Sequence, residues 1–336
     1  MSTYYEVKGQ NVEGVATDPT NLTPGQIWYN TGTQKIKFYG LIGPNAWATS
    51  SPTNVARQRV GPAGTATAAM AFGGEPQTGA TEKYDGTAWT NNPTGLNTTR
   101  WGLGGAGTQT AAIAFAGRNG SAPYVKVETE AFNGSSWTNT GYNVNVGVAN
   151  FANAGTQTSA LKFGGSDPTA SSAPATNSTE KYNGSSWTNN PNSMNTPSGI
   201  FNFGGSGTQT AALAFAGNVY NLGGSTGQTE LFNGSSWTTS PNSMNVGRTE
   251  LTGCGTQTST IASGYQSTPG ASELWNGSSW SNTTNRNTAT FSPRASGSTT
   301  SGLFFTGKTY VSPAVTGNTE TWYGGTANAT QVIKTQ

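Results

Sequence analysis

The chain has 336 residues, of which 32% are hydrophobic, 10% aromatic and only 9% charged, and its formal net charge is +2. This combination argues against disorder, which usually joins low hydrophobicity to high charge and few aromatic residues, and it is typical of short strands linked by Gly- and Asn-rich turns. With no histidine and a single cysteine, Cys254, the chain cannot form an intrachain disulfide, an ordinary zinc site or a nucleophile activated by histidine.

The N-terminal part of the chain contains three short strand-like segments. They are GQIWYN (25–30), KIKFYG (35–40) and NAWAT (45–49), which have the order and spacing of the last three strands of a unit that repeats further along the chain. Trp47 lies 42 residues before Trp89, in register with the later tryptophans. We therefore expect a partial first unit over 24–50. Residues 1–23 fall outside the repeat, lack the pattern of a signal peptide and are expected to form an N-terminal attachment segment.

From residue 51 onward, two sequence signatures alternate. The first is Gly-Thr-Gln-Thr, or a variant of it, followed by a small apolar run, and its copies begin at Gly64, Gly107, Gly155, Gly207, Gly255 and Gly297. The second is Thr-Glu-x-aromatic, a turn and a tryptophan, and its copies begin at Thr81, Thr129, Thr179, Thr229, Ser272 and, in degenerate form, Thr319. Successive copies of the first signature start 42 to 52 residues apart, which is the repeat length of β-propeller blades.

Each repeat predicts four strands: a glycine-rich run, the apolar run, the Thr-Glu-x-aromatic segment and a segment that carries the tryptophan. Asn-Gly or Asp-Gly between the third and fourth strands is a strong hairpin signal, for which we expect a type I′ turn. Glycines in the first strand suit the crowded centre of a ring, where backbones approach closely. The recurring aromatic residues are expected to pack between neighbouring blades.

These patterns predict an all-β fold, a β-propeller of about seven four-stranded blades. Six full repeats cover 51–336, and the partial blade over 24–50 is the seventh. The alternative is six blades with a separate N-terminal hairpin. The last repeat lacks its tryptophan and ends in ATQVIKTQ (329–336), which we expect to be the strand that closes the ring.

The sequence resembles two groups of proteins. Gly73-Gly74, Tyr84-Asp85 and Trp89, together with the later segment 244–248, resemble the kelch repeat. The segments GTQTAALAFAG (207–217) and TEKYNGSSWTNNPNSMNTP (179–197) are similar to kelch-like virion and tail proteins of bacteriophages, and PGQIWYNTGTQKIKFYG (24–40) resembles a segment frequent in phage fibre proteins.

The resemblance implies a non-enzymatic virion structural protein, a component of the tail or its fibres. Such a protein is made in the bacterial cytoplasm and released by lysis. Its expected partners are other virion proteins, bound through the N-terminal segment, further copies of the same chain, and a host surface glycan or receptor. We expect no cofactor or metal. We also expect no nucleic-acid partner, because Lys and Arg are not clustered, and no membrane insertion, because no apolar run approaches about 18 residues.

Glutamate recurs at the second position of the second signature, at Glu82, Glu130, Glu180, Glu230, Glu273 and Glu320. Equivalent positions in successive blades are held apart by the ring, so a catalytic carboxylate pair is not expected among them. Each should cap a backbone group or pair with an arginine of a neighbouring blade, such as Arg100, Arg248 or Arg294. The acids outside the repeat, Glu75, Asp167 and Glu250, could serve a carbohydrate-cleaving site, an alternative that we rank third.

Three further repeated features have plain structural explanations. The glutamines of Gly-Thr-Gln-Thr could face a ligand in the central channel, but hydrogen bonds from blade to blade are the favoured prediction. The Asn-Gly-Ser units match glycosylation sequons, yet the turn explains them without modification. Cys254 is expected to be a small packed residue.

Binding residues are sought in the loops between the second and third strands, which differ most from repeat to repeat: 75–80, 118–126, 166–177, 218–228, 266–271 and 308–318. Loops on a rigid scaffold commonly carry binding sites. The side chains suited to stacking on a sugar or to hydrogen bonding with it are Arg118, Tyr124, Lys126, Asp167, Tyr220, Tyr265 and Tyr310. The alternative is an architectural protein of the capsid or neck that binds no ligand and whose loops have drifted neutrally.

Overall fold

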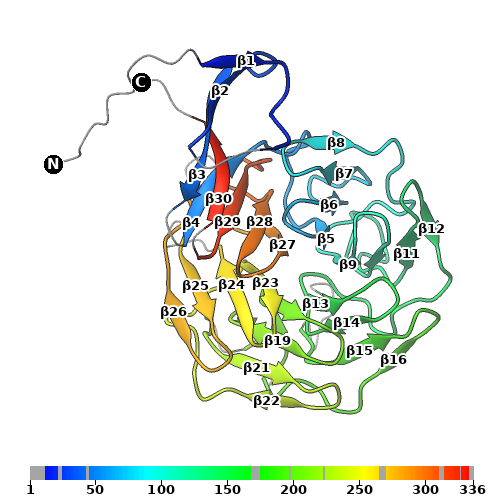
Figure 1. Ribbon diagram of the computed structural model, residues 1–336. Coiled ribbons are helices and arrows are strands. Elements are labelled where there is room, and N and C mark those ends of the chain that lie inside the picture. Colours follow the sequence, from blue (N-terminus) through cyan, green and yellow to red (C-terminus); the bar gives the residue numbers. More distant parts are fainter. Residues whose placement is uncertain are drawn as a thin grey trace.

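The computed structural model describes residues 12–21, 25–42, 45–167, 175–196, 198–221, 224–264, 270–309, 314–325 and 327–332. Within these ranges every regular element is a β-strand. The strands form a ring of sheets around a central axis, and a further sheet projects from the rim of the ring (Figure 1). This confirms the all-β propeller fold.

The ring contains six four-stranded antiparallel sheets, the blades, which are numbered 1 to 6 in the chain order of their innermost strands. Their innermost strands are β5 (Gly61–Gly64), β9 (Gly104–Gly107), β13 (Ala152–Gly155), β18 (Gly204–Gly207), β23 (Thr252–Thr256) and β27 (Arg294–Gly297). The second strands are β6 (Ala69–Phe72), β10 (Ala112–Phe115), β14 (Ala160–Phe163), β19 (Ala212–Phe215), β24 (Ser259–Ser263) and β28 (Ser301–Phe305). The third strands are β7 (Thr81–Tyr84), β11 (Thr129–Phe132), β15 (Thr179–Tyr182), β21 (Thr229–Phe232), β25 (Ser272–Trp275) and β29 (Thr319–Tyr323). The outermost strands are β8 (Trp89–Asn91), β12 (Trp137–Asn139), β16 (Trp187–Asn189), β22 (Trp237–Thr239), β26 (Trp280–Asn282) and β4 (Ala46–Ser50).

The preferred count of seven blades is wrong, and the alternative count of six blades is correct; the separate N-terminal hairpin of that alternative is part of a four-stranded sheet outside the ring. Each innermost strand contacts the next around the ring, and β27 contacts β5 to close it. The fourth strand of the sixth blade comes from the N-terminus, because β4 pairs with β29 and sets Trp47 opposite Trp322. Trp47 therefore supplies the tryptophan that the last repeat lacks.

The other N-terminal strands do not form a blade. β1 (Glu13–Val15), β2 (Ile27–Asn30), β3 (Lys35–Ile42) and β30 (Ala327–Val332) form the projecting sheet, here called the outer sheet. The C-terminal strand was expected to close the ring, but it pairs with β3 in this sheet instead. The spacing of Trp47 correctly predicted a tryptophan strand of a blade. Spacing alone could not show that the strand paired with it lies at the far end of the chain. A two-stranded sheet of β17 (Ile200–Phe201) and β20 (Asn218–Val219) extends the loops of the fourth blade.

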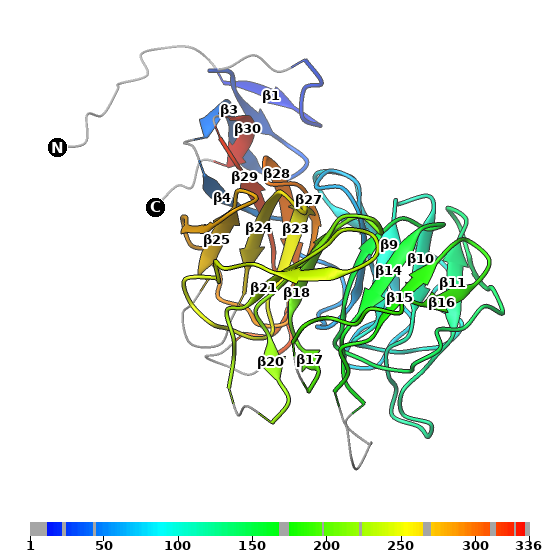
Figure 2. The same ribbon diagram turned by 90° about the horizontal axis from the view of Figure 1, so that it is seen from below.

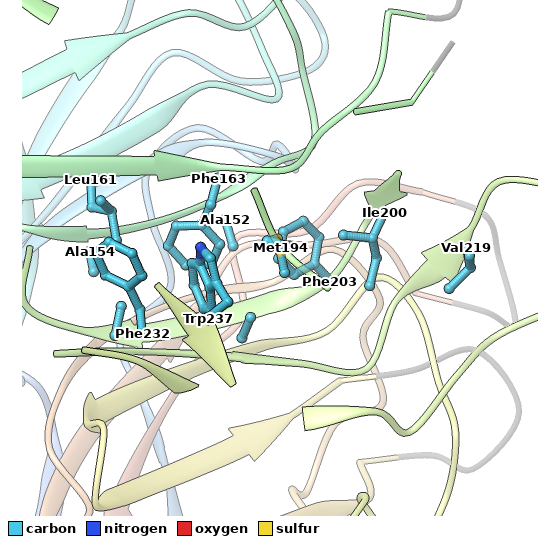
Figure 3. Packing of buried hydrophobic residues seen from close by; sticks show 12 residues of the cluster. Ala152, Ala154, Leu161, Phe163, Met194, Ile200, Phe203, Val219, Phe232 and Trp237 are labelled. Atoms are coloured by element: carbon cyan, nitrogen blue, oxygen red, sulfur yellow. The ribbon is translucent and has the colours of Figure 1, made fainter. Parts of the chain in front are cut away.

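Aromatic side chains pack between the blades, as predicted. The Trp137 ring of blade 2 lies 4.7 Å from Phe72 of blade 1 and 5.1 Å from Phe132 of its own blade. Its indole Nε1 donates a hydrogen bond of 2.9 Å to Thr81 Oγ1 of blade 1. Figure 3 shows the corresponding group between blades 3 and 4, where Trp237 packs against Phe163 and Phe232.

Glycine is required in the innermost strands because a phenylalanine ring occupies the space beside it. A Cβ at Gly61 would lie 2.2 Å from the ring of Phe72, and one at Gly204 would lie 2.1 Å from Phe215. The turn between the third and fourth strands differs from the type I′ expectation. Gly134 has positive φ, but Asn133 does not. The Asn133 side chain instead accepts hydrogen bonds from the backbone N–H groups of Ser135 and Ser136.

The recurrent glutamates tie the incoming connection to each blade. Glu130 is fully buried, accepts hydrogen bonds from the backbone N–H groups of Asn97 and Thr98, and forms an ion pair of 2.9 Å with Arg100. The other ion pairs of this kind are Arg57–Glu82, Lys162–Glu180, Arg248–Glu273 and Arg286–Glu320. The predicted caps and the Arg100 and Arg248 pairs are confirmed, whereas Arg294 pairs with none of these glutamates.

Candidate functional site

The blades enclose an axial channel of about 160 Å³, lined by residues from the innermost strands of all six blades. Most of the lining is glycine, alanine or serine, so the walls expose backbone groups and few functional side chains. Arg294 is the one charged side chain in this lining, among the described residues. Arg294 begins β27, so this residue lies toward one end of the channel.

One end of the channel is framed by a closed ring of backbone hydrogen bonds. The position two residues before each innermost strand has φ between 52° and 63°, in the left-handed region; these residues are Arg59, Gly102, Asn150, Asn202, Glu250 and Ser292. Each N–H donates to the carbonyl of the preceding member, at N···O distances of 2.7 to 3.5 Å, and Arg59 closes the circle by donating to Ser292. Left-handed residues other than glycine are uncommon and mark positions that the surrounding structure over-determines. We call this ring and its flanking side chains the axial mouth.

Strand direction assigns the axial mouth to one face of the propeller. The innermost strand of every blade begins at the mouth, so the mouth shares its face with the connections between blades and with the loops between second and third strands. We call this the variable-loop face. The hairpin turns, which contain the Gly-Thr-Gln-Thr and Asn-Gly sequences, lie on the opposite face. In Figure 2 the loops around β17 and β20 lie at the bottom and the outer sheet lies at the top.

Charged side chains gather at the axial mouth. Arg59 binds two carboxylates, Glu75 of its own blade at 3.2 Å and Glu250 of blade 5 at 2.9 Å. The guanidinium of Arg59 also lies 5.3 Å from the centre of the Trp101 ring. Blades 1, 2 and 5 are therefore linked across the end of the channel by side chains of residues far apart in the sequence.

Two more guanidinium groups complete this cluster. Arg118 lies 4.6 Å from the centre of the same Trp101 ring. Arg294 donates from Nε to the Val60 carbonyl and from Nη1 to that of Pro293, each at 3.0 Å. Burial lowers the pKa of Arg294 to about 10, and the nearby charge of Arg59 contributes to this shift while Glu250 opposes it. Arg294 is still a cation at neutral pH.

Three of the predicted binding residues share one loop. Arg118 and Lys126 stand at its two ends, where the Lys126 N–H donates to the Gly117 carbonyl, and Tyr124 is 43% exposed near its tip. The loop is braced, because Asn119 N–H donates to the Tyr124 carbonyl. Lys126 is buried, so its side chain is the least available of the three.

The remaining predicted binding residues are not brought to this cluster. Tyr220 is half-buried between the loops of blades 3 and 4, beside Gly199, and Asp167 is half-buried at the end of blade 3. Tyr265 and Tyr310 lie outside the described residues. Sequence reasoning missed Arg59 and Trp101. The available signal was their place just before the glycine-rich strand, where the chain passes closest to the axis.

Other candidates have structural roles. Gln109 donates to the carbonyls of Ala69 and Tyr84 in the preceding blade, which confirms the blade-to-blade prediction, and its equivalents do the same. Cys254 is buried, as expected, and burial raises its pKa to about 12.

Glu75 and Glu250, two of the acids considered for carbohydrate cleavage, do meet at the mouth, but the Arg59 guanidinium bridges them. Across the described residues, no cluster of three or more His, Cys, Asp or Glu side chains is arranged to hold a metal ion. In the same part of the chain there is no helix of the length and apolarity needed to cross a membrane.

Comparison with known proteins supports the fold. The solved structure titled "Structure of YjhT" superimposes with a TM-score of 0.66 and 14% sequence identity, covering 84% of this chain and 99% of that one. No protein-family profile and no curated protein sequence matches the chain, so the kelch and bacteriophage resemblances stay predictions. A structural likeness at this identity shows the fold alone: the chain is a β-propeller.

Proposed function

We propose that this protein is a non-enzymatic structural component of a bacteriophage virion, in the tail or its fibres. In this proposal the N-terminal part attaches the propeller to the particle, and the variable-loop face binds a glycan or protein on the host surface. The observation that carries the proposal is the arrangement of the two faces. The outer sheet, which contains both ends of the described chain, lies on the face opposite the variable loops (Figure 2). An attached propeller would present its loops away from the particle.

Hydrogen bonds hold the strands and the first loop of the outer sheet together, which suits an attachment element. Asp18 accepts hydrogen bonds from Trp28 at 3.0 Å, Asn30 at 2.7 Å and Lys37 at 2.6 Å, which fastens the segment after β1 to β2 and β3. Partial burial alone would raise the pKa of Asp18, but the hydrogen bonds and the Lys37 charge outweigh it and lower the pKa. The ionised carboxylate is therefore a stable part of this sheet at neutral pH.

The variable-loop face has the chemistry of a recognition surface. It combines an exposed tyrosine, guanidinium groups and amide side chains on loops that hydrogen bonds hold in place. Gln77 links two of these loops, because its Oε1 accepts from Gly120 N–H at 2.7 Å and its Nε2 donates to Thr99 Oγ1 at 2.8 Å. Ordered loops lose less conformational entropy when a ligand binds. Carbohydrate cleavage ranks lower, because Arg59 occupies the space between the two acids at the mouth.

Gold-labelled antibodies against the propeller would test the assignment on purified phage particles. Label at the tail tip or along fibres is the expected result. Label over the capsid or neck would contradict it and favour the architectural alternative, in which the propeller decorates the particle and binds no ligand. Absence of label, with the protein also absent from the particle by mass spectrometry, would refute a virion role altogether.

A further inference from the structure

We infer that the axial mouth binds the anionic group of an acidic glycan, a carboxylate or a phosphate, through Arg118 and Arg294. This inference rests on the proposed function, because it names the class of ligand that the variable-loop face would recognise. It is carried by the pairing of charges, by the way each guanidinium is held, and by the neighbouring exposed aromatic side chain.

The pairing of charges singles out two arginines. All seven arginines of the chain lie in the described residues. Five of them contact a glutamate carboxylate within 4.0 Å, at distances up to 3.3 Å, and these are Arg57, Arg59, Arg100, Arg248 and Arg286. Among the described residues, no carboxylate pairs with Arg118 or Arg294. Both of these arginines lie at the axial mouth, where Glu75 and Glu250 are the paired carboxylates among the described residues, and both are already bound by Arg59.

The Arg118 guanidinium is oriented before any ligand arrives. It stacks on Trp101, and its backbone forms bridges with both Trp101 and Val125. A guanidinium held against an aromatic ring keeps a planar fork of donors that matches carboxylate and phosphate.

Arg294 supplies a second positive charge, at the wall of the channel. Its hydrogen bonds go to neutral carbonyls, which fix its position, and no carboxylate of the described residues forms an ion pair with it. Arg59 is linked to both arginines, since its guanidinium lies 5.3 Å from the centre of the Trp101 ring that Arg118 also contacts, and its charge acts on Arg294. The three guanidinium groups and the two carboxylates bound by Arg59 leave one positive charge in excess at the mouth, which an anion would neutralise.

The size and surroundings of the mouth define the ligand further. The channel behind the mouth has a volume of about 160 Å³, and its lining is mostly glycine, alanine and serine, which leaves room for a small acidic group. Tyr124, exposed on the same loop as Arg118, offers an aromatic face and a hydroxyl to the attached sugar ring. The acidic group would therefore point into the mouth while the sugar stays at its rim.

Calorimetric titration of the full chain with three sugars tests the inference. The probes are D-glucuronate, glucose 6-phosphate and glucose, which share a ring and differ in the acidic group. We expect glucuronate, glucose 6-phosphate or both to bind at least about tenfold more tightly than glucose, a difference within reach of one charge-assisted pair. The stronger of the two acidic sugars identifies a carboxylate or a phosphate as the source. Equal affinity for all three sugars, or no heat with any of them at millimolar concentration, would overturn the inference.

Matched variants keep the result specific. Arg118→Ala should weaken binding of the acidic sugar at least about tenfold. Arg118→Lys should recover only part of this loss, because lysine keeps the charge and lacks the fork. Lys35→Ala removes an exposed cation from the outer sheet and should leave affinity unchanged. An Arg118→Ala protein with the unfolding midpoint and the affinity of the parent would refute the role of Arg118.

Failure of this inference can be told apart from failure of the proposed function. Fluorescently labelled propeller is bound to host cells, with and without excess of the acidic sugar. If replacement of the 118–126 loop abolishes cell binding while Arg118→Ala and the sugar have no effect, the acidic ligand is wrong and host recognition stands. If replacement of the variable loops leaves cell binding intact, the proposed recognition face is wrong whatever the sugars show.

Discussion

Replacing Glu130 with glutamine is expected to destabilise the propeller by about 3–5 kcal/mol, the usual cost of removing one partner from a buried ion pair. Both Glu130 and Arg100 have side chains with 0% exposure. Burial lowers the pKa of Arg100, and the Glu130 carboxylate opposes that shift. Without the carboxylate, the guanidinium would remain charged and buried, and the glutamine amide would face the N–H groups of Asn97 and Thr98. Denaturant unfolding followed by tryptophan fluorescence measures the change.

The chain provides a matched control at Glu230, the same position of blade 4. Glu230 is equally buried and caps the N–H groups of Asn195 and Thr196, but no Lys or Arg among the described residues pairs with it. Glu230→Gln removes hydrogen bonds to a charged acceptor, worth about 1.5–3 kcal/mol, and leaves no buried cation without its partner. Equal costs at the two positions would show that the Arg100 charge is not what makes Glu130 important.

Trp137→Ala is expected to cost about 3–5 kcal/mol, the range for removing a large aromatic side chain from a packed core. The change would empty the seam between blades 1 and 2, where the indole contacts Phe72 and Phe132. It would also leave Thr81 Oγ1 without its donor. The free energy of unfolding, from denaturant titration, is the measurement.

Two milder variants divide this cost. Trp137→Phe keeps part of the ring packing, and Thr81→Val removes the hydroxyl that the indole binds, so each should cost clearly less than Trp137→Ala. A loss below about 1 kcal/mol for Trp137→Ala would lie outside the range for a buried tryptophan. It would mean that the seam contributes little to stability and that the blades are held together mainly at the axis.

The sequence predicted the blade because each blade is a local unit. The Thr-Glu-x-aromatic strand, its turn and the tryptophan strand lie within eleven consecutive residues, such as 129–139, so their hairpin follows from short-range rules. The ion pair between Arg100 and Glu130 was also predictable, since a glutamate occupies the position of Glu130 in every repeat and Arg100 lies in the connection before it. The prediction that Arg294 pairs with one of these glutamates was wrong, because Arg294 begins an innermost strand at the channel wall, away from the glutamates of the third strands.

What sequence could not predict are the contacts between distant parts of the chain. Trp47 and Trp322 pair across most of the sequence, and a spacing rule cannot choose between a blade made at the N-terminus and one shared by both ends. The axial mouth has the same character. Arg59 and Glu250 are separated by 191 residues, and only closure of the ring brings them together with Trp101.

Adsorption of phage particles that contain altered propellers tests the division between the two faces most directly. One variant has the 118–126, 166–177 and 218–228 loops replaced by the shorter sequence of 75–80, and the other lacks residues 1–42, which removes β1, β2 and β3 but keeps β4. We predict that loop-replaced protein is incorporated into particles that fail to adsorb to the host, and that the shortened protein folds but is missing from particles. Loop-replaced particles that adsorb normally, or shortened protein that is incorporated normally, would contradict the account.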